Sequence, residues 1–195
     1  MDKVRRIDSI AVPLLHADID TDQIIPARFM SRTRAEGFAP CLFHDLRFTA
    51  GGVTRHFVLD HPTYSGAHIL VAGANFGCGS SREQAVYALW DFGFRAVIAP
   101  SFGDIFFTNC LQNGLLPIVL SEATASDLGR LLTRTPGMRV VIDLTKQTVS
   151  AAGQSHGFDM DADWKRLLRE GLDEIDGTVE QMAAINAFEA RHRIW

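Results

Sequence analysis

The sequence predicts an α/β fold with a mostly parallel sheet and helices at the C-terminal end of the chain. Residues 68–72 form a short apolar run of the kind that a buried strand gives. Apolar residues then recur at helical spacing over 85–90, and residues 95–99 form a second apolar run. A strand, a helix and another strand in this order make a β-α-β unit, whose strands run parallel.

The N-terminal residues predict a strand followed by polar loops. Residues 7–15 alternate loosely between apolar and polar side chains, which indicates a first strand. The acidic stretch at 18–26 lacks the glycine and the glutamate of a calcium-binding loop, and it predicts a helix cap at Thr21 or Asp22. Residues 28–40 carry three arginines and little periodicity, which favours a mobile loop that either binds a ligand or stays solvated.

Two further stretches precede the central strand. Residues 42–48 are expected to pack against the core, and residues 56–61 form either a short strand or a loop. His56 and His61 stand five positions apart with no carboxylate or thiol at a suitable spacing. These two histidines are therefore not expected to bind a metal ion.

The stretch between the central strand and the central helix is rich in glycine, and it predicts a site for an anion. Ser80 and Ser81 are each followed three residues later by Glu or Gln, the capping-box pattern, so the helix is expected to begin there. Gly77 and Gly79 permit close backbone approaches, and Arg82 offers a planar guanidinium to a carboxylate or phosphate. A helix N-terminus also favours negative charge. The alternative is a serine that only caps the helix beside a solvated arginine.

The C-terminal half predicts one more parallel strand and then a different pattern. Ser101 and Asp104 repeat the capping-box pattern at the start of a helix, and Pro117 indicates an edge or first-residue position for the strand at 115–120. Asn109 and Asn113 fall in this part without an assignable role. The remaining elements are expected to be a surface helix at 124–132, a hairpin of strands at 139–144 and 147–151, and closing helices at 163–170 and 179–191. The apolar faces of the closing helices are expected to join the core and not to bind a partner.

Composition excludes several classes of protein. Hydrophobic residues at 47% and charged residues at 22% are ordinary globular values, and residues 1–195 are expected to form a single domain. A net charge of −4 without a basic run argues against nucleic acid as a partner. No apolar stretch approaches the ~20 residues of a membrane helix, and the first residues do not resemble a signal peptide. Three cysteines, an odd number, indicate a reducing compartment, so a cytoplasmic location is expected.

Three motifs carry a resemblance to a known family. They are Asp-x-Asp-Thr-Asp-x-Ile-Ile-Pro at 18–26, Gly-Cys-Gly-Ser-Ser-Arg-Glu at 77–83, and Pro-Ser-Phe-x-Asp-Ile-Phe followed by Leu-Leu-Pro within 100–117. Together they resemble the small subunits of 3-isopropylmalate dehydratase, over nearly the whole chain. The resemblance implies the swivelling β/β/α domain of the aconitase superfamily, a three-layer fold.

The same resemblance implies roles for individual residues. Ser80 would be the catalytic base, and the residues that would hold a hydroxy-dicarboxylate substrate are Ser81, Arg82, Arg28 and Arg34. Supporting positions would be Thr21, Asp22, Gly77 and Gly79. Residue chemistry leaves open which of the two serines is the base. A helix N-terminus and a nearby guanidinium would both favour a serine alkoxide.

The resemblance also implies a partner. A large subunit would carry a [4Fe–4S] cluster and form a heterodimer or heterotetramer with this chain, which would bind no cofactor or metal itself. The three cysteines of the chain are spread over 41–110 and lack the Cys-x-x-Cys spacing of an iron–sulfur site. The chain is expected to be inactive alone, and with its partner to isomerise isopropylmalate in leucine biosynthesis by removing and re-adding water.

Departures from the family pattern keep alternatives open. Ala35 and Glu36 replace an Arg-Thr pair that many relatives carry, so homoaconitate, citraconate or dimethylmalate are alternative substrates. Gln84 stands where histidine is common, and little effect is expected from this difference. A non-enzymatic phosphate-binding module remains an alternative, as does a nucleophilic thiol at Cys78.

Overall fold

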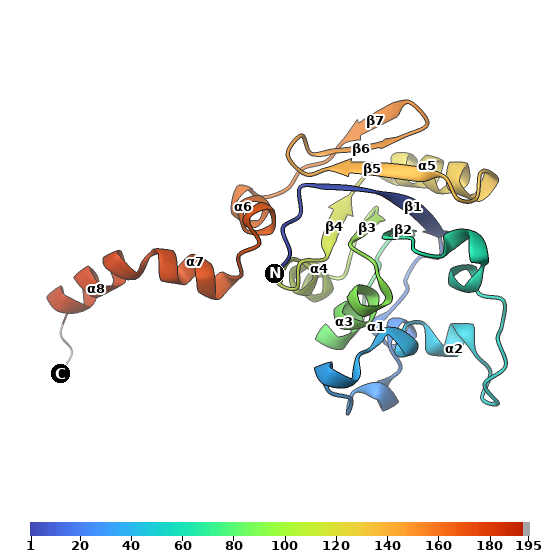
Figure 1. Ribbon diagram of the computed structural model, residues 1–195, viewed down its shortest axis with the longest axis horizontal. Coiled ribbons are helices and arrows are strands. Elements are labelled where there is room, and N and C mark those ends of the chain that lie inside the picture. The colour runs from blue at the N-terminus through green and yellow to red at the C-terminus, as the bar shows by residue number, and fades with distance from the viewer. Residues whose placement is uncertain (193–195) are drawn as a thin grey trace.

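A computed structural model describes residues 1–192 and contains a seven-stranded mixed sheet in the order β4-β3-β2-β1-β5-β6-β7 (Figure 1). The strands are β1 (Arg6–Leu14), β2 (Ile69–Ala72), β3 (Ala96–Ala99), β4 (Leu116–Val119), β5 (Arg139–Asp143), β6 (Thr148–Ala151) and β7 (Gln154–Gly157). The helices are α1 (Thr21–Ile24), α2 (His44–Arg47), α3 (Glu83–Phe92), α4 (Asp104–Gln112), α5 (Glu122–Arg134), α6 (Ala162–Glu170), α7 (Glu174–Glu180) and α8 (Met182–Arg191).

The sheet has a parallel half and an antiparallel half, and β1 belongs to both. On one side, β1 pairs parallel with β2, in the register that places Ala11 opposite Ile69. On the other side it pairs antiparallel with β5, with Arg6 opposite Asp143. The β-α-β units at β2-α3-β3 and β3-α4-β4 build the parallel half. The α/β class expected from the sequence is confirmed.

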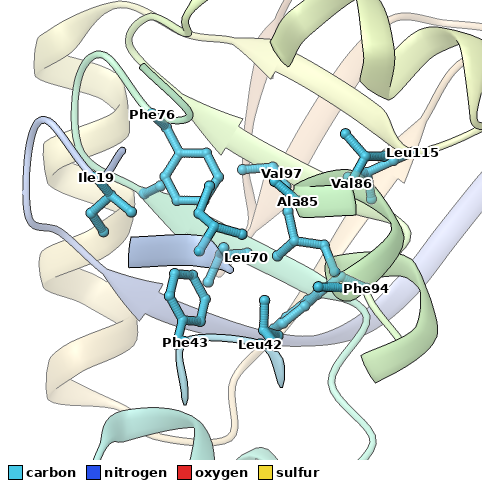
Figure 2. Packing of buried hydrophobic residues seen from close by; sticks show 14 of the residues in the cluster. Ile19, Leu42, Phe43, Leu70, Phe76, Ala85, Val86, Phe94, Val97 and Leu115 are labelled. Atoms are coloured by element: carbon cyan, nitrogen blue, oxygen red, sulfur yellow. The ribbon is translucent and has the colours of Figure 1, made fainter. Parts of the chain in front are cut away.

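Helices cover both faces of the sheet, which gives three layers. Successive residues of a strand point to opposite faces, so on β2 Leu70 packs in one cluster and Val71 in the other. The first cluster includes the buried face of α3 and the loops near the N-terminus, as Figure 2 shows around Leu70 and Phe43. The second cluster includes the buried face of α5. The parallel strands are buried on both faces, which explains their continuous apolar runs.

Most predicted strands and helices are confirmed to within a few residues, but both capping-box predictions are wrong. The helix α3 begins at Glu83, its N-cap is Arg82, and no side chain caps it. The helix α4 likewise has Gly103 at its N-cap without a side-chain hydrogen bond. Near the N-terminus, the cap of α1 is Asp20, whose carboxylate accepts from the Gln23 N–H, and not Thr21 or Asp22. The predicted edge position of the strand that contains Pro117 is confirmed, because this strand, β4, is the outermost strand on one side of the sheet.

Two features near the C-terminus differ from expectation. The helix predicted at 179–191 corresponds to α8, an additional short helix, α7, lies before it, and α7 and α8 bury none of their side chains. Val179 is 56% exposed and Phe188 is 61% exposed, so the expectation that the apolar face of 179–191 joins the core is wrong, although α6 does bury Leu167 and Leu168. Figure 1 shows α7 and α8 extending away from the sheet. Within residues 1–192, every helix is too short or too polar to cross a membrane.

Candidate active site

The candidate site lies where the parallel strands β1 and β2 end, and the loops that follow these two strands pair with each other. Asp18 N–H donates to the Ala74 carbonyl at 2.9 Å, and Gly77 N–H donates to the Ile19 carbonyl at 2.7 Å. Thr21 N–H then donates to the Cys78 carbonyl at 2.9 Å. The two family-like motifs therefore form one unit at the carboxyl end of parallel strands, which is the usual position of a ligand in an open α/β sheet.

A buried phenylalanine anchors the glycine-rich loop to the core. Phe76 is fully buried, and its ring lies in the cluster around Leu70 and Ile19 (Figure 2). Its N–H donates to the Ser101 carbonyl at 3.1 Å, and the Ser101 hydroxyl accepts from Asn75 N–H at 2.8 Å. Ser101 thus fixes this loop and does not cap α4. This anchoring role of Phe76 was not predicted from the sequence. The only sign of it there is a single large apolar residue in a glycine-rich stretch.

Gly77 must be glycine for two separate reasons. Its φ angle is +73°, a left-handed conformation that other residues rarely adopt. In addition, a Cβ placed on Gly77 would lie 2.2 Å from Cγ of the Phe106 ring on α4. Gly79, two residues on, also has a positive φ of +95°, but a Cβ there would meet its nearest neighbours only at 3.5 Å. The loop thus packs against α4 at Gly77 and remains open at Gly79.

We expect Gly77→Ala to lower the free energy of unfolding by about 2–4 kcal/mol, because it combines backbone strain with overpacking against Phe106. Urea denaturation of the isolated chain measures this change. Gly153→Ala is the matched control, since Gly153 has a φ of +79° and open space around its Cβ position. The control should cost only about 1 kcal/mol. Equal losses in the two variants would contradict the packing argument.

The side chain of Ser80 is exposed to solvent, but the buried residue Thr21 holds the Ser80 backbone in place. Its carbonyl accepts hydrogen bonds from the Thr21 hydroxyl and from Arg82 N–H, both at 2.9 Å. Thr21 is only 1% exposed, and its Oγ1 lies 3.4 Å from the Ser80 Oγ. A hydroxyl group has one proton and two lone pairs. While Thr21 donates to the carbonyl, the Ser80 hydroxyl faces a Thr21 lone pair.

Arg82 combines with the start of α3 to give a positively charged position. The Arg82 side chain is 17% exposed and forms an ion pair with the more exposed carboxylate of Asp22. The first turn of α3 carries backbone N–H groups without intrahelical acceptors, and its dipole favours an anion. Ser81, next to Arg82, is exposed. The structure therefore brings Ser80, Ser81, Arg82 and Asp22 together on an accessible surface, with Thr21 buried beneath Ser80.

Arg28 forms contacts elsewhere. Its guanidinium donates to the Asp45 carboxylate at 2.8 Å and lies 3.0 Å from His44 Nδ1. This hydrogen bonding lowers the pKa of Asp45 to about 2. Ser80, Ser81 and Arg82 take no part in these contacts, so a substrate-binding role for Arg28 stays a prediction.

Arg34 is also engaged away from Ser80. It donates to both carboxylate oxygens of Asp91 at 3.0 Å, and its guanidinium lies 4.1 Å from the centre of the Tyr87 ring. Asp91 lies in the last turn of α3, about 12 Å along the axis from Glu83 at about 1.5 Å per residue. The segment at 28–40 contains short 3-10 turns at Ala27–Phe29, Arg34–Glu36 and Ala39–Cys41. A role for Arg34 in substrate binding would require release from Asp91, and it stays a prediction.

The cysteines do not provide a thiolate or a metal site in the structure. Partial burial and the charges of Asp20 and Asp18 raise the pKa of the Cys78 thiol, and α3 begins five residues after it. Cys78 therefore does not lie in the first turn of a helix, and its surroundings disfavour the thiolate, so nothing here supports a nucleophilic role for Cys78. Burial also raises the pKa of Cys41 and Cys110. Within residues 1–192, no three His, Cys, Asp or Glu side chains are grouped so that they could hold a metal ion.

Comparison with known proteins defines the class first. The family model of the aconitase C-terminal domain matches residues 1–123, which include every loop of the candidate site. The chain is 42% identical to the 3-isopropylmalate dehydratase small subunit of Magnetococcus marinus, over 99% of this chain and 96% of that one. It is 44% identical to the protein of the same name from Hahella chejuensis, over 99% and 95% of the two chains. The chain therefore belongs to the 3-isopropylmalate dehydratase small-subunit family.

A solved structure supports the same assignment. The crystal structure of 3-isopropylmalate dehydratase from Methanocaldococcus jannaschii aligns with a TM-score of 0.66 and 27% sequence identity. The alignment covers 94% of this chain and 99% of that one. The aconitase-type fold expected from the motifs is thus confirmed.

Proposed function

We propose that this chain is the small subunit of a hydro-lyase that interconverts 2-isopropylmalate and 3-isopropylmalate by removing and re-adding water, a step of leucine biosynthesis. The observation that carries the proposal is the accessible group of Ser80, Ser81 and Arg82, held by the buried hydroxyl of Thr21. Family membership over nearly the whole chain supports it. We also propose that residues 1–195 form a single domain and that the protein acts in the cytoplasm.

In this proposal Ser80 removes the proton next to a substrate carboxylate. A serine hydroxyl is a weak base at its ordinary pKa, so its alkoxide must be stabilised. The guanidinium of Arg82 and the N-terminus of α3 both favour negative charge at this position. The Thr21 hydroxyl can turn its proton from the Ser80 carbonyl towards Ser80 Oγ, 3.4 Å away, as charge develops there. Thr21 would then stabilise the alkoxide.

Ser81 and Arg82 hold a carboxylate of the substrate. In the free chain the carboxylate of Asp22 forms an ion pair with the guanidinium of Arg82. The Asp22 side chain is exposed enough to move aside when a substrate binds. A planar guanidinium binds a carboxylate through two parallel hydrogen bonds, which fixes orientation as well as charge. The substrate is expected to be a hydroxy-dicarboxylate.

The other half of the reaction needs a partner. Departure of a hydroxyl group is helped by a Lewis acid, and the described residues of this chain offer no group that holds a metal. We assign that role to a large subunit that carries a [4Fe–4S] cluster and joins this chain in a heterodimer or heterotetramer. Every step assigned to this chain is binding, orientation or proton transfer.

The proposal is tested by producing this chain together with a large subunit of the family and assaying isopropylmalate turnover without oxygen. We expect activity from the complex and none from either subunit alone. Mixing the separately purified subunits should restore activity, which controls for a contaminating enzyme. Turnover by the isolated chain would contradict the proposal that the active site is shared between two subunits. A complex that forms but leaves isopropylmalate unchanged would contradict the proposed substrate.

The loop at 28–40 is expected to influence which substrate the enzyme prefers. Glu36, at one of the departures from the family pattern, accepts from Thr33 N–H at 2.6 Å and from the Thr33 hydroxyl at 2.9 Å. These bonds lower the pKa of Glu36 and keep its charge on the loop. Comparison of kcat/KM for isopropylmalate with homoaconitate, citraconate and dimethylmalate discriminates among the related hydro-lyase activities. We expect isopropylmalate to be preferred, as the names of the relatives suggest.

A further inference from the structure

The helix α4 contacts the catalytic loop at both of its ends. At the N-terminal end of α4, Gly103 N–H donates to the Phe76 carbonyl at 3.0 Å, and the Phe106 ring fills the space beside Gly77. Just beyond its C-terminal end, the Asn113 amide donates to the Glu83 carboxylate at 2.9 Å. The loop that contains Ser80 is therefore fixed to one helix both before and after the proposed catalytic residues.

The Asn113 amide is itself held in one orientation. Its Nδ2 also donates to the Asn109 carbonyl at 2.9 Å, so both N–H bonds of this nitrogen have acceptors. The backbone N–H of Asn113 closes the end of α4 with hydrogen bonds to the carbonyls of Asn109 and Cys110. Asn113 can therefore act as a fixed donor, because its direction is set by the helix that it ends.

Glu83, the acceptor, is the first residue of α3 and directly follows Arg82. The start of α3 has no side-chain cap, so neither serine nor arginine fixes it locally. Arg82 N–H donates to the Ser80 carbonyl, which means that a shift at the start of α3 is passed to both residues. The hydrogen bond from Asn113 is thus a constraint on where α3 begins and, through it, on the direction of the Arg82 side chain.

We propose that Asn113 is a positioning residue of the active site, which aligns Arg82 and Ser80 by holding Glu83. The assignment rests on the proposed function of the Ser80 loop and adds a residue that does not itself touch the substrate. Asn113 was one of two asparagines whose role could not be predicted from the sequence.

The decisive variants reverse the hydrogen bond. Asn113→Asp in the assembled complex places two carboxylates opposite each other, and we expect kcat to fall between about tenfold and a hundredfold, because small misplacements of reacting groups cost about that much. The thermal midpoint should stay within about 8 °C of wild type, since the two hydrogen bonds that Asn113 donates to Glu83 and to the Asn109 carbonyl are lost. The double variant Asn113→Asp/Glu83→Gln restores a donor and an acceptor with reversed polarity. It should recover part of the lost kcat, although the bond to the Asn109 carbonyl is not restored, because residues in one hydrogen-bond network show such coupling.

A matched control and a second readout separate this role from a purely structural one. Gln112→Ala alters the neighbouring residue of α4, whose side chain contacts Glu174 instead, and it should leave kcat and KM unchanged. In the isolated chain, Asn113→Asp should speed hydrogen exchange at the first hydrogen-bonded amides of α3, from Ala85 on, but not in β2. Wild-type kcat in Asn113→Asp, or no rescue in the double variant, would overturn the inference. An inactive wild-type complex would instead count against the proposed function, while the exchange experiment would still test the contact.

Discussion

Replacing Ser80 with alanine is expected to reduce kcat of the assembled complex by about 10²- to 10⁴-fold, the range that loss of a general base produces. The hydroxyl is exposed and lies 3.4 Å from Thr21, whereas the hydrogen bonds that hold the loop are made by the Ser80 carbonyl and survive the change. The fold should therefore be unaffected. Steady-state kinetics with isopropylmalate, together with a melting curve of the isolated chain, measure the two effects separately.

Ser81→Ala is the matched control for this experiment, because it removes a hydroxyl from the adjacent exposed position. If Ser81 only holds a carboxylate, its loss should raise KM by about tenfold, the worth of one hydrogen bond to a charged group. Its kcat should stay within a few-fold of wild type. The opposite result, with kcat lost in Ser81→Ala and kept in Ser80→Ala, would exchange the two roles.

Arg82→Gln should lower kcat/KM by about 10²- to 10³-fold, because it removes two charge-assisted hydrogen bonds to the substrate carboxylate. It also removes the positive charge that favours the Ser80 alkoxide, so kcat is expected to fall along with substrate affinity. Arg82→Lys should recover only part of the loss, since an ammonium group cannot reproduce the paired geometry. Kinetics of the complex over a range of isopropylmalate concentrations separate the effects on kcat and KM.

Asp22→Asn tests whether the loss in Arg82→Gln comes from the substrate or from the ion pair within the chain. The Asp22 side chain is 57% exposed, so an ion pair with Arg82 adds little stability. We expect Asp22→Asn to change kcat/KM by less than about tenfold, because the guanidinium remains. If Asp22→Asn is as damaging as Arg82→Gln, the arginine matters for its contact with Asp22 and not for binding a carboxylate.

The sequence was sufficient to predict the parallel half of the sheet and the loop with Ser80 and Arg82, because buried strands and glycine-rich turns leave strong local patterns. It was misleading about where α3 begins. The Ser-x-x-Glu spacing suggested a cap, but the backbone of this loop is used to pair with residues 18–22, and a pairing between distant segments leaves no local signal. The position of Asn113 opposite Glu83 was not predictable for the same reason.

Near the C-terminus, other local rules failed. The strand β7 was missed because the turn before it is formed by Ala152 and Gly153, both with positive φ, where Asn-Gly is the usual signal. The apolar residues of 179–191 were assigned to the core because their spacing is helical, yet a helical repeat does not tell whether anything packs against it.

The shared strand β1 also has a consequence for how the protein is made. It is synthesised before both of its neighbours, β2 and β5, and β5 is the later of the two. Until β5 appears, one edge of β1 stays open to pairing with other chains. Contacts between such distant segments slow folding, so the nascent chain is expected to depend on chaperones until about residue 143 has been translated.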